Sequence, residues 1–264
     1  MGQQPNRQQR RDAARAERER RAAAAATRQR QRRALLAAVA VTATAVVAIA
    51  VALGSSSDGD RARGDVPASP HGAHAPAAAA LLDGIPQDGT LLGQPDAPVT
   101  LVEFADLQCP FCRNFAVEVL PEIVEHYVRP GKVRLDLRLL RFVGEDSRRA
   151  AAVAAAAAAQ NRMWHFADLF YRNQGVENSG YATDEFLRAI AGAAGLDAGR
   201  ALAGRNGAAA ERLLAGGERR AAAAGVHSTP SFLVGPTGGS LRPLETRSLD
   251  SDEFHSALDA QLDR

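Results

Sequence analysis

Cys109 and Cys112 are the only cysteines of this 264-residue chain, and they lie three positions apart in the run Cys109-Pro110-Phe111-Cys112. Such a pair can exchange with other disulfides, bind a metal or form a structural disulfide. A zinc site needs four ligands, and the chain has neither a second cysteine pair nor histidines at ligand-like spacing. A structural disulfide would close a loop too short to restrict the unfolded chain. The pair therefore predicts redox chemistry without a metal or a bound cofactor, since the cysteines themselves carry the electrons.

The residues around the pair predict a strand followed by a helix. Residues 99–105 are β-branched and apolar, which is typical of a buried strand, residues 106–112 form a turn, and residues 112–128 continue as a helix. Cys109 would lie at the helix N-terminus, where free N–H groups and the helix dipole favour a thiolate. Pro110 in the first turn lacks an N–H that would have no partner there. This arrangement predicts a thiol that is reactive at neutral pH.

The rest of the C-terminal part predicts an α/β domain. Residues 133–140 alternate apolar and polar side chains and complete a strand-helix-strand unit. Residues 147–225 have a helical pattern almost throughout. Residues 231–234 and 241–244 predict short strands, and residues 251–262 predict an amphipathic helix with a serine cap. The expected architecture is an α/β core that is split by a helical block.

Residues 34–53 carry no charge and no proline. A helix of this length spans about 30 Å, the thickness of the hydrocarbon core of a bilayer. Four arginines at positions 28–33 precede the segment, so the positive-inside rule keeps the N-terminus in the cytoplasm and exports the remainder. We expect a single-pass anchor that contacts membrane lipid, with the catalytic domain outside the cell membrane. A cleaved signal peptide that releases the domain is the alternative, because residues 48–50 resemble a cleavage site.

The segments on either side of this anchor are polar or rich in small residues. Residues 1–33 hold eleven arginines against three acidic residues, a net charge of +8, and predict a basic cytoplasmic tail. A nucleic-acid-binding arm is the alternative, but the tail has no aromatic residue for base stacking, so we expect no nucleic-acid partner. Residues 54–86 are rich in Gly, Ser, Asp, Pro and Ala and predict a flexible linker. The folded domain is then expected over residues 87–264.

Several segments match one known family in both residues and order: PDAPVTLVEFADLQCPFC at 95–112, WHFADLF at 164–170, NQ at 173–174 and GVHSTPSF at 225–232. They resemble the DsbA-like, thioredoxin-fold disulfide oxidoreductases of bacterial cell envelopes. The resemblance covers about residues 88–263. It implies a thioredoxin fold with a helical domain inserted at about residues 146–215, here preceded by one transmembrane helix.

The resemblance also implies roles for the cysteines and for one carboxylate. Cys109 matches a solvent-facing nucleophile, and Cys112 matches a buried resolving cysteine. Glu103 matches a buried acid that moves protons for the resolving cysteine, a task that requires a buried carboxyl with a raised pKa. Strongly oxidising members have a histidine between the cysteines, whereas Phe111 offers neither charge nor hydrogen bond. We therefore expect the pKa of Cys109 to be lowered less than in those members.

Substrate contact is implied for two pairs of residues. Thr229 and Pro230 match the cis-proline loop that faces the active site, where the backbone of the preceding residue pairs with a bound substrate strand. The sequence alone leaves the peptide bond before Pro230 open between cis and trans. Pro110 and Phe111, between the cysteines, are assigned to the same contact.

The implied function is disulfide exchange with thiol-containing exported polypeptides, with oxidation as the favoured direction. A membrane quinone-linked oxidase, similar to DsbB or to vitamin-K-epoxide reductase, would then reoxidise the pair. Two alternatives remain open. The same fold works as a reductase or isomerase, or the domain is a non-catalytic chaperone or binding module with a vestigial disulfide.

Overall fold

The structure is a computed structural model that describes residues 72–246 and 248–264. The predicted tail (1–33) and the predicted membrane anchor (34–53) lie outside the described residues. Within the described ranges, no helix is both long and apolar enough to cross a membrane.

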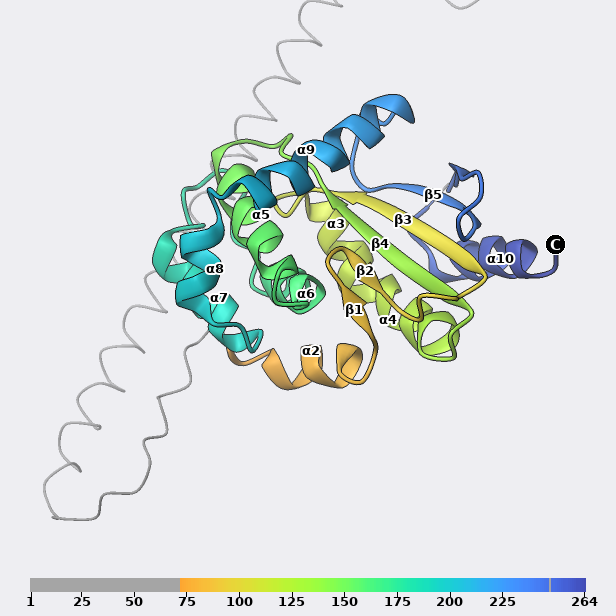
Figure 1. Cartoon of the computed structure of the whole chain (residues 1–264), viewed down its shortest axis with the longest axis horizontal. Helices are drawn as coiled ribbons and strands as arrows, with labels where there is room; N and C mark the ends of the chain where they lie inside the picture. The colour runs from red at the N-terminus through yellow and green to blue at the C-terminus, as the bar shows by residue number, and fades with distance from the viewer. Residues whose placement is uncertain (1–71, 247) are drawn as a thin grey trace, which may run out of the picture. The chain divides into compact units, whose positions relative to one another are not determined.

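Strands and helices alternate along the first half of the described part, and a run of helices follows (Figure 1). In chain order the elements are α2 (Ala75–Leu82), β1 (Gln87–Asp88), β2 (Leu91–Leu92), β3 (Val99–Ala105), α3 (Pro110–Asn114), the π-helical turn η2 (Phe115–Val119), α4 (Leu120–Ile123), the π-helical turn η3 (Val124–Val128), β4 (Val133–Leu139), α5 (Glu145–Ala158), α6 (Met163–Arg172), α7 (Asp184–Ala193), α8 (Ala198–Gly204), α9 (Ala208–Ala223), β5 (Ser231–Pro236), β6 (Arg242–Pro243) and α10 (Ser251–Leu262). The predicted strand at 99–105 and the predicted helix that ends at 128 are confirmed.

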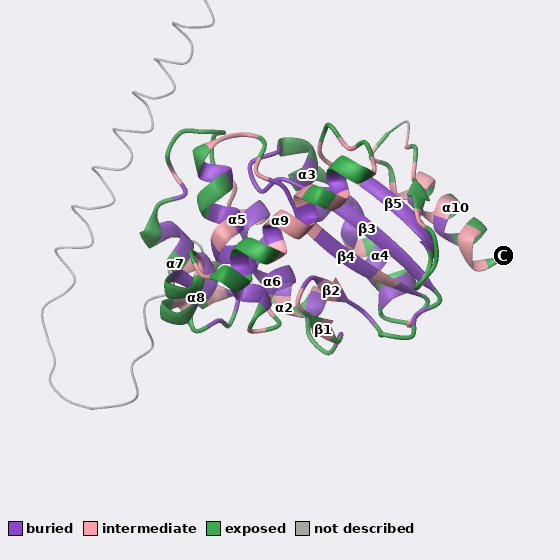
Figure 2. Ribbon diagram, turned by 45° about the horizontal axis from the view of Figure 1, so that its top comes forward, coloured by how far each residue is buried: buried purple, intermediate pink, exposed green. Residues whose placement is uncertain are grey.

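The strands form one six-stranded sheet in the order β1-β2-β4-β3-β5-β6. Strand β3 lies between β4, to which it is parallel, and β5, to which it is antiparallel. Every residue of β3 is buried, as its purple colour in Figure 2 shows. Because β5 is antiparallel to β3, three chain segments meet at the same end of these central strands: the turn after β3, the loop after β4 and the loop before β5. The cysteine pair lies at this end of the sheet.

The helical block between β4 and β5 confirms the predicted insertion, with one difference in its extent. It begins at Glu145 and continues to Ala223 instead of ending near residue 215. The reason is that α9 is one continuous helix whose buried face packs on α5 and on β4. In Figure 1, α5 to α8 group to the left of β3 and β4, and α10 lies to the right, where it contacts β5.

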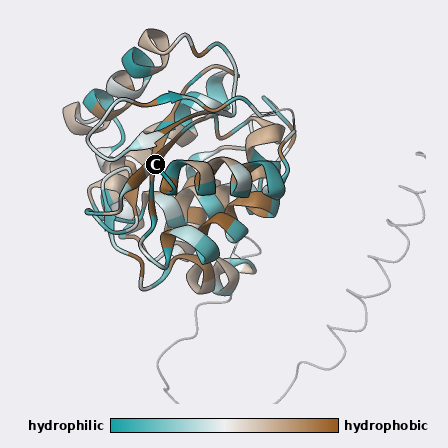
Figure 3. Cartoon of the chain, turned by 90° about the vertical axis from the view of Figure 1, so that its right-hand side faces the viewer, coloured by the Kyte–Doolittle hydropathy of each residue, from teal (hydrophilic) through white to brown (hydrophobic). Residues whose placement is uncertain are grey.

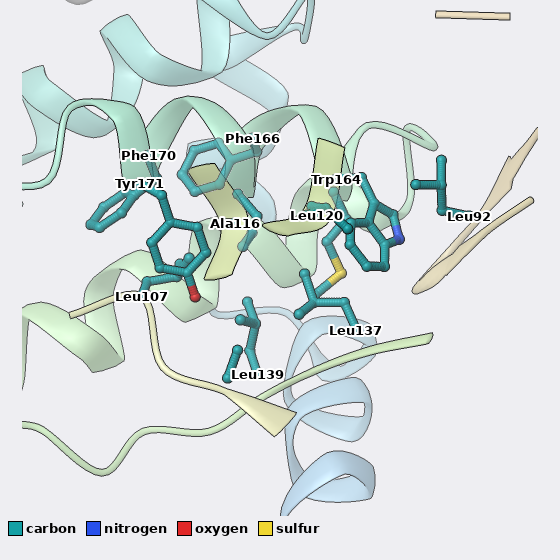
Figure 4. Close-up of a cluster of buried hydrophobic side chains, with 14 of the residues drawn as sticks. Leu92, Leu107, Ala116, Leu120, Leu137, Leu139, Trp164, Phe166, Phe170 and Tyr171 are labelled. Atoms are coloured by element: carbon teal, nitrogen blue, oxygen red, sulfur yellow. The ribbon is translucent and has the colours of Figure 1, made fainter. Parts of the chain in front are cut away.

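A large apolar cluster joins the sheet to the helical block. Trp164, Phe166 and Phe170 of α6 are buried, together with Leu137 and Leu139 of β4 (Figure 4). Hydrophobic and hydrophilic residues alternate along the helices, in brown and teal in Figure 3, as expected for helices with one buried face.

The predicted flexible linker (54–86) is wrong in its last part. Residues 75–82 form helix α2, in which Ala78 and Leu82 are buried, and Ile85 after it is also buried. Helix α2 contacts α6 and η3. At the C-terminal end of α2, the carbonyls of Ala80 and Leu81 accept hydrogen bonds from the guanidinium of Arg129. The alanine-rich composition that suggested a linker instead favours a helix, because alanine has the highest helix propensity. The folded domain therefore begins before residue 87.

Candidate active site

Cys109 lies at the point where β3 has ended and α3 begins. It is the N-cap residue of α3, with extended backbone angles (φ −70°, ψ 122°), and Pro110 is the first helical residue. The N–H of Cys109 donates to the carbonyl of Asp106 (3.0 Å), and the N–H of Arg113 donates to the carbonyl of Cys109 (3.1 Å). Proline starts a helix well, because its fixed φ suits the first turn and its missing N–H is not needed there. The predicted strand-turn-cysteine arrangement is confirmed.

The two cysteines are free thiols, so the structure represents the reduced pair. Cys112 is fully covered, and Cys109 is only 6% exposed. The expectation of a solvent-facing Cys109 is therefore wrong in degree, although Cys109 is the more accessible of the two. The cause is the loop before β5: the thiol of Cys109 donates to the carbonyl of Thr229 at 3.3 Å. Only the sulfur of Cys109 has a path to an incoming thiol.

Hydrogen bonds to the sulfur lower the pKa of Cys109 to about 6. The thiol of Cys112 is the largest cause, burial acts in the opposite direction, and bonds with the side chain of Thr229 and with the N–H groups of Cys112 and Phe111 add to the lowering. The helix N-terminus supplies these N–H groups, as expected for an N-cap thiolate. That Phe111 leaves the pKa of Cys109 less lowered than a histidine at this position would stays a prediction.

Cys112 has the opposite electrostatic environment. Burial is the largest cause that raises its pKa well above the ordinary value, and its hydrogen bond to Cys109 and the negative charges of Cys109 and Glu103 raise it further. At neutral pH the pair therefore carries one thiolate, on Cys109, and one thiol, on Cys112. A thiolate that accepts a bond from its neighbour is the nucleophile that disulfide exchange needs.

Glu103 lies in the centre of the sheet, between Leu137 of β4 and Phe232 of β5. The side chain is buried, and its Oε1 has no hydrogen-bond partner among the residues that the structure describes. Burial is the main cause that raises the pKa of Glu103 to about 8, and the negative charge of Cys109 adds to it. The carboxyl can therefore hold a proton at neutral pH beside the cysteine pair, which is the environment that the sequence prediction required.

The peptide bond between Thr229 and Pro230 is cis, and these residues directly precede β5. The structure thus brings Thr229 to Cys109, as the resemblance implied. Pro110 and Phe111 lie at the molecular surface, and Phe111 is 62% exposed.

Sequence reasoning missed two residues that hold the active-site turn in place. The buried carboxylate of Asp106 accepts from the N–H of Gln108 (2.8 Å), from the N–H groups after β4 and from the hydroxyl of Ser147. The Nε2 of Gln174 donates to the carbonyls of Leu107 (2.7 Å) and Cys109 (3.3 Å). Both residues lie in segments that carry the family resemblance, which was the available signal.

Within the part of the chain that the structure describes, no group of three or more His, Cys, Asp or Glu side chains is arranged to hold a metal ion.

Comparisons with known proteins agree with this geometry. A family model described as thioredoxin matches residues 87–260. The "Probable disulfide bond formation protein D" of Bacillus cereus is 41% identical over 101 residues, which are 38% of this chain and 47% of that protein. The chain thus spans about half the length of the curated relatives it matches.

Solved structures resemble nearly the whole described part. The crystal structure of BdbD from Bacillus subtilis (oxidised) matches with a TM-score of 0.59 and 21% identity, over 68% of this chain and 98% of that one. A thioredoxin-like oxidoreductase from Silicibacter pomeroyi DSS-3 matches with a TM-score of 0.53 and 28% identity, over 70% and 98%. This chain therefore belongs to the thioredoxin family, and its fold is the DsbA-like form with an inserted helical domain.

Proposed function

We propose that this chain is an extracytoplasmic thiol–disulfide oxidoreductase that oxidises the thiols of exported polypeptides through Cys109 and Cys112. The single observation that carries the proposal is the asymmetric pair, with the pKa of Cys109 lowered to about 6 and that of Cys112 raised. The names of the similar proteins support it, since they describe disulfide bond formation and a thioredoxin-like oxidoreductase.

Oxidation would start from the Cys109–Cys112 disulfide. A substrate thiolate attacks the sulfur of Cys109, a substrate–Cys109 disulfide forms, and the bond to Cys112 breaks so that Cys112 leaves as a thiolate. A second substrate thiolate then attacks the substrate sulfur of this mixed disulfide, and Cys109 leaves as a thiolate. The substrate gains a disulfide and loses two electrons, which the protein keeps as the reduced pair. Cys109 is a good leaving group because its thiolate is stabilised.

Glu103 is proposed to supply the proton that Cys112 takes up. The pKa of Cys112 is raised well above its ordinary value, so a Cys112 thiolate inside the protein is unstable and needs a donor. The carboxyl of Glu103, with its pKa raised to about 8, holds such a proton at neutral pH. The negative charge of Glu103 is also among the causes that raise the pKa of Cys112.

Thr229, Pro230, Pro110 and Phe111 are proposed to contact the substrate. The loop of Thr229 and Pro230 already lies against the Cys109 sulfur, and Phe111 presents an exposed ring next to it.

The cellular setting is part of the same proposal. The predicted anchor (34–53) would hold the domain outside the cell membrane, and exported polypeptides would be the substrates. A quinone-linked membrane oxidase, similar to DsbB or to vitamin-K-epoxide reductase, would reoxidise Cys109 and Cys112. An oxidant is required chemically, because each turnover leaves the pair reduced.

The Cys112→Ala variant is expected to accumulate mixed disulfides with exported proteins. The Cys109 thiolate of this variant attacks a disulfide of an exported protein, which breaks that disulfide and joins one of its sulfurs to Cys109. Without the Cys112 thiol, the protein cannot release the captured partner by attack of its own second sulfur, so these mixed disulfides persist. Non-reducing electrophoresis of the full chain expressed in a bacterial cell envelope measures them. The Cys109→Ser, Cys112→Ala double variant is the control and should give none. A folded Cys112→Ala protein without any trapped species would refute the proposed function.

The lowered pKa of Cys109 predicts the direction of electron flow. Thiolate absorbance of the reduced protein should titrate with a midpoint near pH 6, because hydrogen bonds stabilise the charged form. The same stabilisation favours the reduced pair, so its reduction potential should lie above the roughly −270 mV of thioredoxin. The Cys112→Ala variant should titrate at higher pH, since it lacks the largest of these bonds. A potential at or below that of thioredoxin would favour a reductase instead.

A further inference from the structure

Tyr171 is a buried residue in the last turn of α6, and the proposed exchange does not use it. It belongs to the helical block, whereas both cysteines follow β3. A buried hydroxyl needs a hydrogen-bond partner, because burial removes it from water. In Figure 4 the hydroxyl oxygen of Tyr171, in red, points toward Leu107 of the active-site turn. The phenol therefore reaches from the helical block to the segment that carries the cysteines.

The hydroxyl of Tyr171 binds the chain just before the cysteine pair. It donates to the backbone carbonyl of Asp106 (3.2 Å), and the N–H of Cys109 donates to the same carbonyl (3.0 Å). One carbonyl thus joins Tyr171 to the N-cap residue of α3. Burial is the main cause that raises the pKa of Tyr171 well above its ordinary value. The hydroxyl therefore keeps its proton, and remains a donor, at every pH at which the Cys109 thiolate forms.

The main chain of Tyr171 binds the segment just after the pair. Its carbonyl accepts a hydrogen bond from Nε of Arg113 (3.2 Å), the exposed residue that follows Cys112. This carbonyl lies at the C-terminal end of α6, where a helix has carbonyls without intrahelical partners and favours positive charge. Tyr171 therefore contacts both segments that flank the cysteine pair, one through its hydroxyl and the other through its carbonyl.

The reduced pair depends on how the first turn of α3 is held. The sulfur of Cys109 accepts hydrogen bonds from the thiol of Cys112 and from the N–H groups of Cys112 and Phe111, and these bonds lower its pKa. All of these donors lie in the first turn of α3. The thiolate exists only in the reduced pair, because the oxidised pair joins the two sulfurs by a covalent bond. Contacts that hold the start of α3 in this arrangement therefore stabilise the reduced state more than the oxidised state.

We propose that Tyr171 is a positioning residue, which holds both ends of the cysteine turn in the arrangement of the reduced pair and so makes the Cys109–Cys112 disulfide a stronger oxidant. This inference rests on the proposed function and adds a residue to it. A contact of equal strength in both states would leave the reduction potential unchanged, because the potential reports the free-energy difference between them. The helical block then takes part in setting the reactivity of the pair, in addition to packing on the sheet.

The Tyr171→Phe variant tests the inference, since it removes the hydroxyl and keeps the ring. Two glutathione thiols reduce the Cys109–Cys112 disulfide and leave as one glutathione disulfide. The equilibrium constant of this reaction should fall about three- to tenfold, the effect of one lost hydrogen bond, and the Cys109 thiolate should titrate at higher pH than in the wild type. Arg113→Lys keeps the charge but has carbon in place of Nε, so it should lower the constant in the same direction.

The matched control is Tyr127→Phe. It removes another buried hydroxyl, which donates to Oδ1 of Asp259 (2.9 Å) at the far end of the helical segment that begins at Pro110. Its glutathione constant should equal that of the wild type. Urea unfolding of both redox forms separates positioning from support of the fold. Tyr171→Phe should lose more unfolding free energy in the reduced form than in the oxidised form, whereas Tyr127→Phe should lose the same in both.

A Tyr171→Phe protein that is destabilised equally in both redox forms, with the wild-type glutathione constant, overturns the inference, because Tyr171 then only supports the fold. An equal fall of the constant in Tyr127→Phe, or a rise in Tyr171→Phe, overturns it too. Arg113 lies at the surface, so Arg113→Lys gives a result even if Tyr171→Phe does not fold, and an unchanged constant there also overturns the inference. If the wild-type disulfide does not exchange with glutathione at all, the proposed function fails instead.

Discussion

The Cys109→Ser variant is expected to lose thiol–disulfide exchange almost completely, with a rate lowered by at least about 10³-fold. A serine hydroxyl does not form a disulfide, so neither the mixed disulfide nor the internal one can exist. The structure leaves no substitute, because Cys112 is fully covered and its pKa is raised, so it is neither accessible nor ionised at neutral pH. Oxidation of a peptide with two cysteines, followed by mass spectrometry, measures the rate.

The matched control is Cys112→Ser, which keeps the accessible thiol. It should react once with a small disulfide at Cys109 but should not complete a cycle. Thermal unfolding of both reduced variants shows whether they fold. If the chain were a chaperone or binding module with a vestigial disulfide, Cys109→Ser would keep its function in a complementation assay, and that result would contradict the catalytic reading.

The Glu103→Gln variant is expected to change how stability depends on pH. In the reduced native protein the pKa of Glu103 is raised to about 8 from an ordinary value of 4.5. Below pH 4.5 both the native and the unfolded state keep the proton, so the group has no net effect. Between pH 4.5 and 8 the unfolded chain releases the proton and the native protein does not, so the wild-type free energy of unfolding decreases as pH rises. Glutamine does not ionise and removes this decrease.

The difference in unfolding free energy between Glu103→Gln and the wild type should therefore rise by roughly 2–5 kcal/mol from pH 4 to pH 8.5. Urea unfolding of the reduced proteins at several pH values measures it. The buried amide that the substitution introduces can change the unfolding free energy by the same amount at every pH. Such a change does not affect the test, because only the pH dependence is predicted. The exposed Glu118, on the helix after Cys109, supplies the control: Glu118→Gln should stay within about 0.5 kcal/mol of the wild type at each pH. If the difference in unfolding free energy between Glu103→Gln and the wild type did not change with pH, the raised pKa of Glu103 would be contradicted.

Much of the fold could be predicted from the sequence, because the informative patterns are local. The apolar β-branched run at 99–105 has no good alternative to a buried strand, and the turn with Pro110 favours a helix start at that point. The cysteine pair was also predictable, since two cysteines with two residues between them limit the chemistry sharply. The order of strands and helices then led to the split α/β core.

The places where prediction failed depend on contacts between distant segments. Residues 75–82 look like a linker in composition, and only the packing of Leu82 and the bonds from Arg129 make them part of the domain. The exposure of Cys109 also depends on a distant residue: Thr229, 120 positions away, covers the sulfur. No local pattern reports such a contact.

The cysteine pair, its place at the start of a helix and the likeness to DsbA-like proteins were thus determined by the sequence alone, because neighbouring residues carry that information. The tertiary structure decided how the two sulfurs differ. Burial and hydrogen bonding lower the pKa of Cys109 and raise those of Cys112 and Glu103, and these effects come from strands and loops that meet only in the folded sheet. It also decided that the loop after β4 and the loop between α6 and α7 are joined to the active-site turn, through Asp106 and Asn178.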